Sequence, residues 1–156
     1  MKNQFNAGTL RFLENWEFIL RDKYTNEIIS KSEVCNSIVN NGLERIARLI
    51  NGNSGTYFRA IAIGTGTDVV TISDTALQTE YDRSDATLEY ESSYKAKFTY
   101  TFSFSSGTSE AITEAGIFDS DVVLGSVMLA RTTFSAKNVT ASTTLEVIAT
   151  ITTARV

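Results

Sequence analysis

Residues 97–105 read KFTYTFSFS, and this stretch decides the fold class. Aromatic side chains alternate there with small hydroxyl-bearing side chains. Because successive side chains of a β-strand point to opposite faces, a period of two predicts a strand with one buried and one solvated face. Lys95 and Lys97 could also make it a base-stacking platform, but in an acidic chain a core face is favoured. The aromatic residues are Phe98, Tyr100, Phe102 and Phe104.

A second alternating stretch, at 144–152, supports the same fold class. Residues 16–20 and 27–31 predict a hairpin whose turn lies at 22–26, with Asn26 able to take a positive φ. The total of seven to nine short strands predicts an all-β fold, an antiparallel β-sandwich or barrel with one short helix. The remaining expected strands are 57–63, 98–104, 111–113, 115–118 and 127–130.

One short helix is expected after Gly42, where apolar residues recur at a helical spacing. Asn40 or Asn41 is expected to cap its start, and Gly52 to end it in the left-handed conformation. Its expected buried face consists of Leu43, Ile46, Ala47 and Ile50.

The composition excludes several classes of function. The chain has 156 residues, the size of one domain, with no His, one Cys and a net charge of −4. Without His, neither a Ser-His-Asp nor a Cys-His site can form, and nearly every standard zinc site is excluded. The acidic balance argues against a nucleic-acid partner, and the absence of a long apolar run argues against a membrane partner. We therefore expect no cofactor and no metal.

The sequence divides into two parts. Residues 1–15 show no clear period and are interpreted as an N-terminal arm or an edge strand. Residues 16–156 are interpreted as a single β-sandwich domain without linker or repeat. Cys35 has no fixed cation beside it in the sequence, so we expect a buried structural residue rather than a reactive thiol.

Two local features could carry chemistry. Residues 64–66, Gly-Thr-Gly, follow a strand as a phosphate-binding loop would, but the third glycine and the Lys of the known fingerprints are missing. A tight strand-ending turn is therefore favoured. Four carboxylates lie close together in the sequence, and a suitably spaced pair could hydrolyse a glycoside, although turn formation is favoured. They are Glu110, Glu114, Asp119 and Asp121.

A resemblance rests on motifs in a fixed order. They are SIVNNGL at 37–43, IAIGTGT at 61–67, DTALQTE at 74–80 before Arg83, ITEAGIFD at 112–119 and MLAR at 128–131. Together they resemble small virion proteins of tailed bacteriophages. The pattern is also similar to the N-terminal, particle-attaching domain of phage tail fibres.

The resemblance implies a structural, non-enzymatic protein of the virion whose partners are phage capsid or tail proteins. It also implies a homo-oligomer, with a trimer favoured. The chain ends at Val156 with no fibre and has no Pro, unlike the tail-fibre domains. We therefore expect an accessory protein on the particle exterior, with capsid decoration ahead of a tail, baseplate or fibre adaptor.

The motif residues are expected to be architectural. Gly116 would permit a bulge or a close backbone crossing. Glu114 would anchor its turn through Arg131 or Arg83, and Leu77 would plug one end of the sandwich. No residue is expected to be catalytic, cofactor-binding or metal-binding. The architectural set is Gly64, Gly66, Leu77, Arg83, Glu114, Gly116, Asp119 and Arg131.

Two alternative functions stay open. One is a carbohydrate-binding β-sandwich in which Trp16, Tyr81 or Tyr90 stacks on sugar rings. The other is a glycan hydrolase that uses Glu114 and Asp119 as its two carboxylates.

Overall fold

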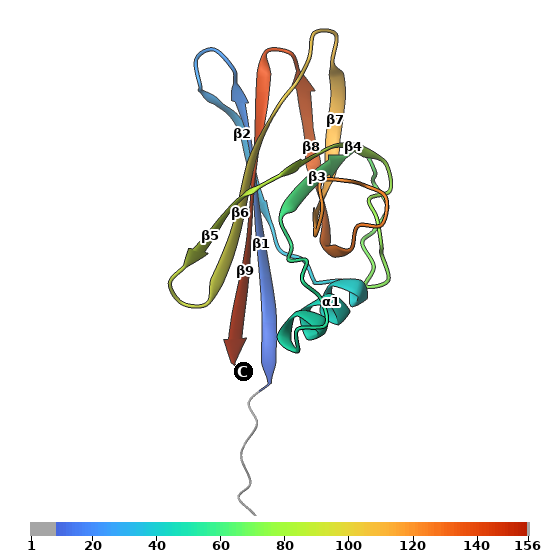
Figure 1. Ribbon diagram of the computed structural model, residues 1–156. Coiled ribbons are helices and arrows are strands. Elements are labelled where there is room, and N and C mark those ends of the chain that lie inside the picture. Colours follow the sequence, from blue (N-terminus) through green and yellow to red (C-terminus); the bar gives the residue numbers. More distant parts are fainter. Residues whose placement is uncertain (1–8, 156) are drawn as a thin grey trace, which may run out of the picture.

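Two antiparallel sheets pack face to face in the computed structural model, which describes residues 9–155 (Figure 1). The strand orders are β2-β1-β9-β6-β5 and β4-β3-β7-β8. Both sheets stay open at their edges, so the expected all-β sandwich is confirmed and the barrel alternative is not. The elements are β1 (Leu10–Asp22), β2 (Ile28–Val34), α1 (Asn40–Ile50), β3 (Ala60–Gly64), β4 (Glu80–Asp85), β5 (Thr87–Glu91), β6 (Lys95–Ser103), β7 (Ser109–Phe118), β8 (Met128–Thr140) and β9 (Thr143–Arg155).

The alternating stretches build the core between the sheets. On the β6–β9 pair, Phe98 lies opposite Ala149 and Phe102 opposite Leu145, and all four side chains are buried. Each large apolar side chain buried in this way contributes about 1.5–3 kcal/mol to folding. The four-stranded sheet completes the core with Ile61, Ile63, Ile112, Ala115 and Ile117.

Strand β1 crosses the boundary between the expected N-terminal arm, residues 1–15, and the expected domain, residues 16–156. Residues 1–8 lie outside the described part of the chain, whereas residues 10–15 form the first half of β1 and pair with β9. Strand β2 begins to pair with β1 only at Trp16, opposite Val34. Within the described residues, the first half of β1 therefore has a strand neighbour on one side only.

The helix forms where the sequence predicts it, but its buried face and its cap differ. Gly42 packs so closely against the backbone of Leu129 in β8 that a side chain at position 42 would overlap it. This contact turns Ile46 and Leu49 toward the core and leaves Ile50 81% exposed. Of the predicted buried face, Ile46 is confirmed, whereas Leu43, Ala47 and Ile50 are exposed and Leu49 packs on the core in their place, because a tertiary contact sets the rotation of the helix.

Of the two predicted helix ends, the first is wrong and the second is confirmed. Val39 precedes the helix without a side-chain cap, so the expected Asn cap is wrong. Gly52, with φ +73°, confirms the expected left-handed end.

Three further expectations are corrected or confirmed by the strands. The two short strands expected at 111–113 and 115–118 are one strand, β7, with a register shift after Ile112. The hairpin turn is confirmed, with Asn26 at φ 61°. Cys35 is exposed rather than buried, because it follows β2 at the edge of the sheet and its thiol lies 3.8 Å from Asn15 Oδ1.

One carboxylate points into the core. Glu14 shares a face of β1 with Trp16, whose indole Nε1 donates to Glu14 Oε2 at 3.1 Å. Its other oxygen, Oε1, is buried without a hydrogen-bond partner, and the residue is 3% exposed. Desolvation therefore raises the pKa of Glu14 to about 7, against the opposing effect of the Trp16 hydrogen bond.

The free energy of unfolding should fall as the pH rises from the unfolded-state pKa of Glu14 to its folded-state pKa. In the unfolded chain Glu14 loses its proton near its ordinary pKa of 4.5, whereas the folded chain keeps it until about pH 7. The folded state therefore binds more protons in this window, and its stability decreases by about 3 kcal/mol across it. Urea unfolding from pH 4 to pH 8 should show this decrease in the wild type relative to Glu14→Gln. Parallel pH profiles of the two proteins would contradict it.

Candidate functional site

The motif residues meet on the outer face of the four-stranded sheet. Along β3, Ile61 and Ile63 point into the sandwich, so Ala62 and Gly64 point to the other side. The same alternation places Glu114, Gly116 and Phe118 of β7 on that outer face. A loop over residues 65–79 covers them, and this covered face is the candidate site (Figure 1).

Glu114 lies at the centre of the site and is fully buried. Its Oε1 accepts hydrogen bonds from the backbone N–H groups of Gly66 at 3.0 Å and Thr79 at 2.8 Å. Its Oε2 accepts from the backbone N–H of Gln78 at 3.0 Å and from Arg131 Nε at 2.9 Å. Four donors thus surround one carboxylate, as a buried charge requires.

Arg131 of β8 extends this network into the covering loop. Its Nη1 pairs with Asp74 Oδ2 at 2.8 Å, and its Nη2 donates to the Asp68 carbonyl at 3.3 Å. Although partial burial opposes the shift, hydrogen bonds from Thr71 and Arg131 hold the pKa of Asp74 below its ordinary value. The expected anchor from Glu114 to Arg131 is therefore present.

The glycines of the motif leave the space that these contacts need. A side chain on Gly64 or Gly66 would collide with Glu114 Oε1, and at Gly64 it would lie 2.6 Å from that atom. At Gly116 it would lie 3.1 Å from Leu77 Cδ2 and 2.9 Å from the Phe118 ring. The glycines thus let the loop lie directly on the sheet.

Arg83 and Leu77 occupy places other than those expected. Arg83 pairs with Glu80 at 2.7 Å instead of Glu114, and its guanidinium lies 3.6 Å from the centroid of the Phe118 ring. Leu77 is buried against Phe118 and Met128 on the outer face, so it covers the sheet rather than plugging an end of the sandwich. Leu77 thus fastens the covering loop to β7 and β8, whereas Arg83 joins β4 to β7 through the Phe118 ring.

Asp119 closes the turn after β7. Its Oδ1 accepts from the backbone N–H of Val127 at 2.7 Å, and its Oδ2 pairs with Arg45 of α1 at 2.9 Å. Asp121 pairs with Arg59 at 2.8 Å. Asp119 has the turn-forming role that the sequence favoured and ties the 119–127 loop to the helix, whereas Asp121 ties this loop to the segment before β3.

The chemistry open to this site is narrow. The Gly-Thr-Gly loop does bind an anion, but the anion is the chain's own Glu114. Thr67 and Asp68 donate their N–H groups to Gln78 Oε1 at 2.7 and 2.9 Å, so these donors are also occupied. Within residues 9–155, no three side chains of metal-ligating type gather as a metal site requires.

Sequence reasoning missed several participants. Gln78 accepts two loop N–H groups, Asp74 pairs with Arg131, and Arg45 pairs with Asp119. Gln78 and Asp74 belong to the DTALQTE motif, so their position in it was the available signal. Arg45 had no such signal, because it lies in α1 and its partner follows β7, far along the chain.

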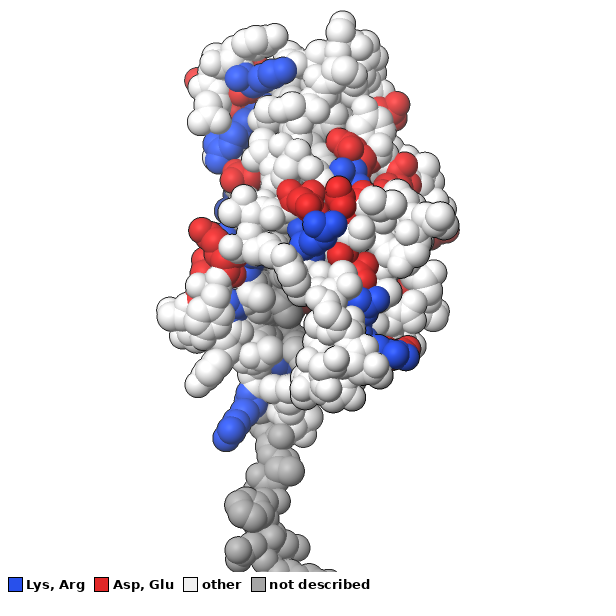
Figure 2. Space-filling view, in the orientation of Figure 1, with Lys and Arg blue, Asp and Glu red and all other residues white. Residues whose placement is uncertain are grey.

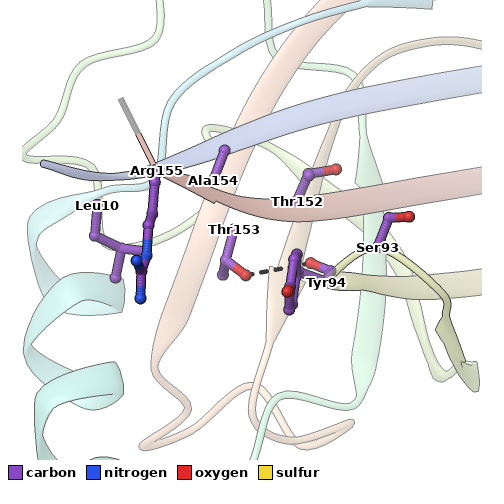
Figure 3. A pocket seen from close by; sticks show the side chains of 7 residues that line it. All are labelled: Leu10, Ser93, Tyr94, Thr152, Thr153, Ala154 and Arg155. Atoms are coloured by element: carbon purple, nitrogen blue, oxygen red, sulfur yellow. Dashed lines mark hydrogen bonds between the residues drawn. The ribbon is translucent and has the colours of Figure 1, made fainter. Parts of the chain in front are cut away.

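Two hollows lie apart from this site. The first, of about 660 Å³, is at the end of the five-stranded sheet, between Leu10, the Ser93–Tyr94 turn and residues 152–155 of β9 (Figure 3). The second, of about 350 Å³, is apolar and shares Tyr94 and Thr153 with the first. No residue of the architectural set lines either hollow.

The surface charges are mixed in sign. Figure 2 shows acidic and basic side chains close together over the face in view. On the five-stranded sheet, Lys31 bridges Glu17 and Glu33, and Lys97 bridges Glu89 and Glu91. In the described part of the chain, no helix is long and apolar enough to cross a membrane.

Comparison with known proteins gives no further guide to identity. No protein-family model, no curated protein and no solved structure matches this chain.

Removing the guanidinium from this network should destabilise the fold. Arg131→Met leaves Glu114 charged and buried without its cation, which costs about 3–5 kcal/mol. The matched control is Arg48→Met, because Arg48 pairs with Glu44 in an exposed i,i+4 contact. Its loss costs less than about 1 kcal/mol. Urea unfolding at pH 7 measures both, and equal losses would contradict a structural role for the buried pair.

A methyl group added at Gly66 should also lower the free energy of unfolding. In Gly66→Ala the added carbon collides with Glu114 and with Gln78, and overpacking of this kind costs about 1–3 kcal/mol. Gly55→Ala is the control, since no atom lies within 4 Å of its added carbon. That variant should stay within about 0.5 kcal/mol of wild type in the same unfolding experiment.

Proposed function

We propose that this protein is a non-enzymatic structural component of a tailed-bacteriophage virion. It docks on the particle exterior, with capsid decoration as the first expectation and a tail, baseplate or fibre adaptor as the second. The resemblance of the ordered motifs to small phage virion proteins supports this class of protein. The main support for a non-enzymatic role is the burial of Glu114. This residue lies at the centre of those motifs and is fully buried, with both carboxylate oxygens hydrogen-bonded.

A site of this kind serves stability rather than turnover. A general acid or nucleophile must reach its substrate, and Glu114 has neither exposure nor a free lone-pair direction. Asp119 is 4% exposed and is occupied by Val127 and Arg45. The glycan-hydrolase alternative therefore loses both of its carboxylates.

The carbohydrate-binding alternative also loses support. Trp16 is fully buried in the core and cannot stack on a sugar. Tyr81 and Tyr90 are 40% and 76% exposed, but they belong to β4 and β5, which lie in different sheets. They do not form one continuous aromatic platform of the kind that binds sugar rings.

Exposed apolar residues support a docking role. Contiguous apolar surface on a soluble protein commonly marks a contact with another protein. Exposed apolar side chains lie on β1, β2 and β5 here, and others lie in loops and in α1. They include Leu43, Ile50, Val69, Ile72, Val122, Val123 and Leu124.

The test is the composition of the particle. Virions produced from the genome that encodes this chain should contain it, as measured by mass spectrometry of purified particles. Deleting the gene should remove density from the particle exterior in a cryo-EM map, and complementation should restore it. A copy number that scales with the major capsid protein supports decoration, and density confined to the tail supports the adaptor.

Two results would overturn this proposal. One is absence of the chain from purified virions, with unchanged density in the deletion. The other is hydrolysis of a host glycan by the wild-type protein that is lost in a folded Glu114→Gln variant.

A further inference from the structure

The sequence contains the pair Asn-Gly twice, once at each end of α1. Asn41-Gly42 lies in the first turn of the helix, and Asn51-Gly52 follows directly after its last residue. An asparagine before glycine can react with its own backbone, because glycine has no side chain to hinder the approach of its nitrogen to the asparagine amide. The structure gives the two pairs different surroundings.

The pair in the first turn is held on both sides. Gly42 is buried, and a side chain at position 42 would overlap the backbone of Leu129 in β8. Just before it, Asn40 donates its backbone N–H to the Ile72 carbonyl at 2.8 Å. The peptide between Asn41 and Gly42 therefore cannot rotate unless the helix separates from β8.

The pair after the helix lies in open space. Asn51 and Gly52 are both exposed, and beyond the neighbouring residues no atom lies within 4 Å of the place where a side chain on Gly52 would begin. The N–H of Gly52 donates to the Leu49 carbonyl at 3.3 Å, a long hydrogen bond. Ring closure requires rotation about ψ of Asn51, away from the observed 8°. This rotation costs exposed hydrogen bonds at the end of the helix but displaces no packed side chain.

A hydrogen bond already polarises the side-chain amide of Asn51. The backbone N–H of Asn53 donates to Asn51 Oδ1 at 3.0 Å. A donor on this oxygen draws electron density from Cγ, and it stabilises the negative charge that the oxygen gains when a nucleophile adds. The carbon that would be attacked is thus activated in the folded turn.

We propose that Asn51 is a modification site at which the chain converts its own asparagine into a carboxylate. The backbone nitrogen of Gly52 loses its proton to a hydroxide ion of the solvent and forms a bond to Asn51 Cγ. The bond from Cγ to Nδ2 breaks, the leaving nitrogen takes a proton from water, and ammonia departs. Water then opens the cyclic imide by breaking one of its two C–N bonds, which yields aspartate or its β-linked isomer, isoaspartate.

Both products change the end of α1 and the connection to β3. Each adds a negative charge beside the last helical carbonyls, which already carry partial negative charge, so the helix end is weakened. Isoaspartate also adds a carbon to the main chain at the start of the 51–59 segment. That segment includes Phe58, a core residue, just before β3. The reaction therefore limits the time for which the helix keeps its observed connection to the sheet.

Peptide mapping of the folded full chain tests the proposal. Trypsin cleaves after Arg45 and Arg48, so Asn41 and Asn51 fall on different peptides. During incubation in mildly alkaline buffer, the Asn51 peptide should gain about 1 Da as the amide becomes a carboxylic acid, and it should separate by chromatography into aspartate and isoaspartate forms. Asn41 should be converted at least about tenfold more slowly, because the helix must first open from β8.

Two controls separate the effect of the fold from that of the local sequence. In guanidinium chloride, where the fold is lost, the two pairs should react at similar rates. Asn51→Gln keeps a side-chain amide but needs a larger ring, so this variant should lose the mass gain at position 51. Fragment spectra distinguish Asn51 from Asn53, which lies on the same peptide.

The proposal is wrong if Asn41 is converted as fast as Asn51 in the folded protein. It is also wrong if Asn51 stays unchanged in the folded protein while both asparagines are converted in denaturant. Neither result depends on the virion experiment, because the reaction needs only this chain and water.

Discussion

A charged carboxylate inside a protein has to be surrounded by donors, and much of this fold follows from meeting that requirement for Glu114. Three of its four donors come from the covering loop and the fourth is Arg131. The loop over 65–79 forms no helix or strand, so its backbone groups need other partners. Glu114 and Gln78 supply many of them. The buried carboxylate therefore orders the 65–79 loop, which has no helical or strand hydrogen bonds of its own to order it.

The same requirement explains the composition of the motifs. Glycine stands where the loop backbone crosses the carboxylate, and Leu77 stands where the loop meets the apolar outer face. Arg83, in the strand β4 that follows the loop, contacts the Phe118 ring and the 119–127 loop. A pattern that resembles a binding fingerprint in the sequence is thus a set of internal contacts.

Local features of the sequence were enough to predict most of the strands, because alternation reports directly on which face is buried. Strands β4 and β5 gave no such signal, since few of their side chains are buried. The Glu114–Arg131 pair could be proposed as well, since motifs placed both residues near one sheet. The rotation of α1 could not be predicted, because it depends on the closeness of Gly42 to Leu129. The role of Arg45 depends in the same way on a contact between segments far apart in the chain, since its partner is Asp119.

The separation of those segments also bears on the order in which the chain folds. Glu114 bonds to groups 48, 36, 35 and 17 positions away. The bonds from the covering loop need β3 and β7 to be aligned, the bond from Arg131 needs β7 and β8 to be aligned, and closing such long loops is slow. Until then the carboxylate stays hydrated and opposes collapse of the loop onto the sheet. We therefore expect Glu114 to delay covering of the outer face until the strand register is right, so that a misaligned sheet remains open to correction.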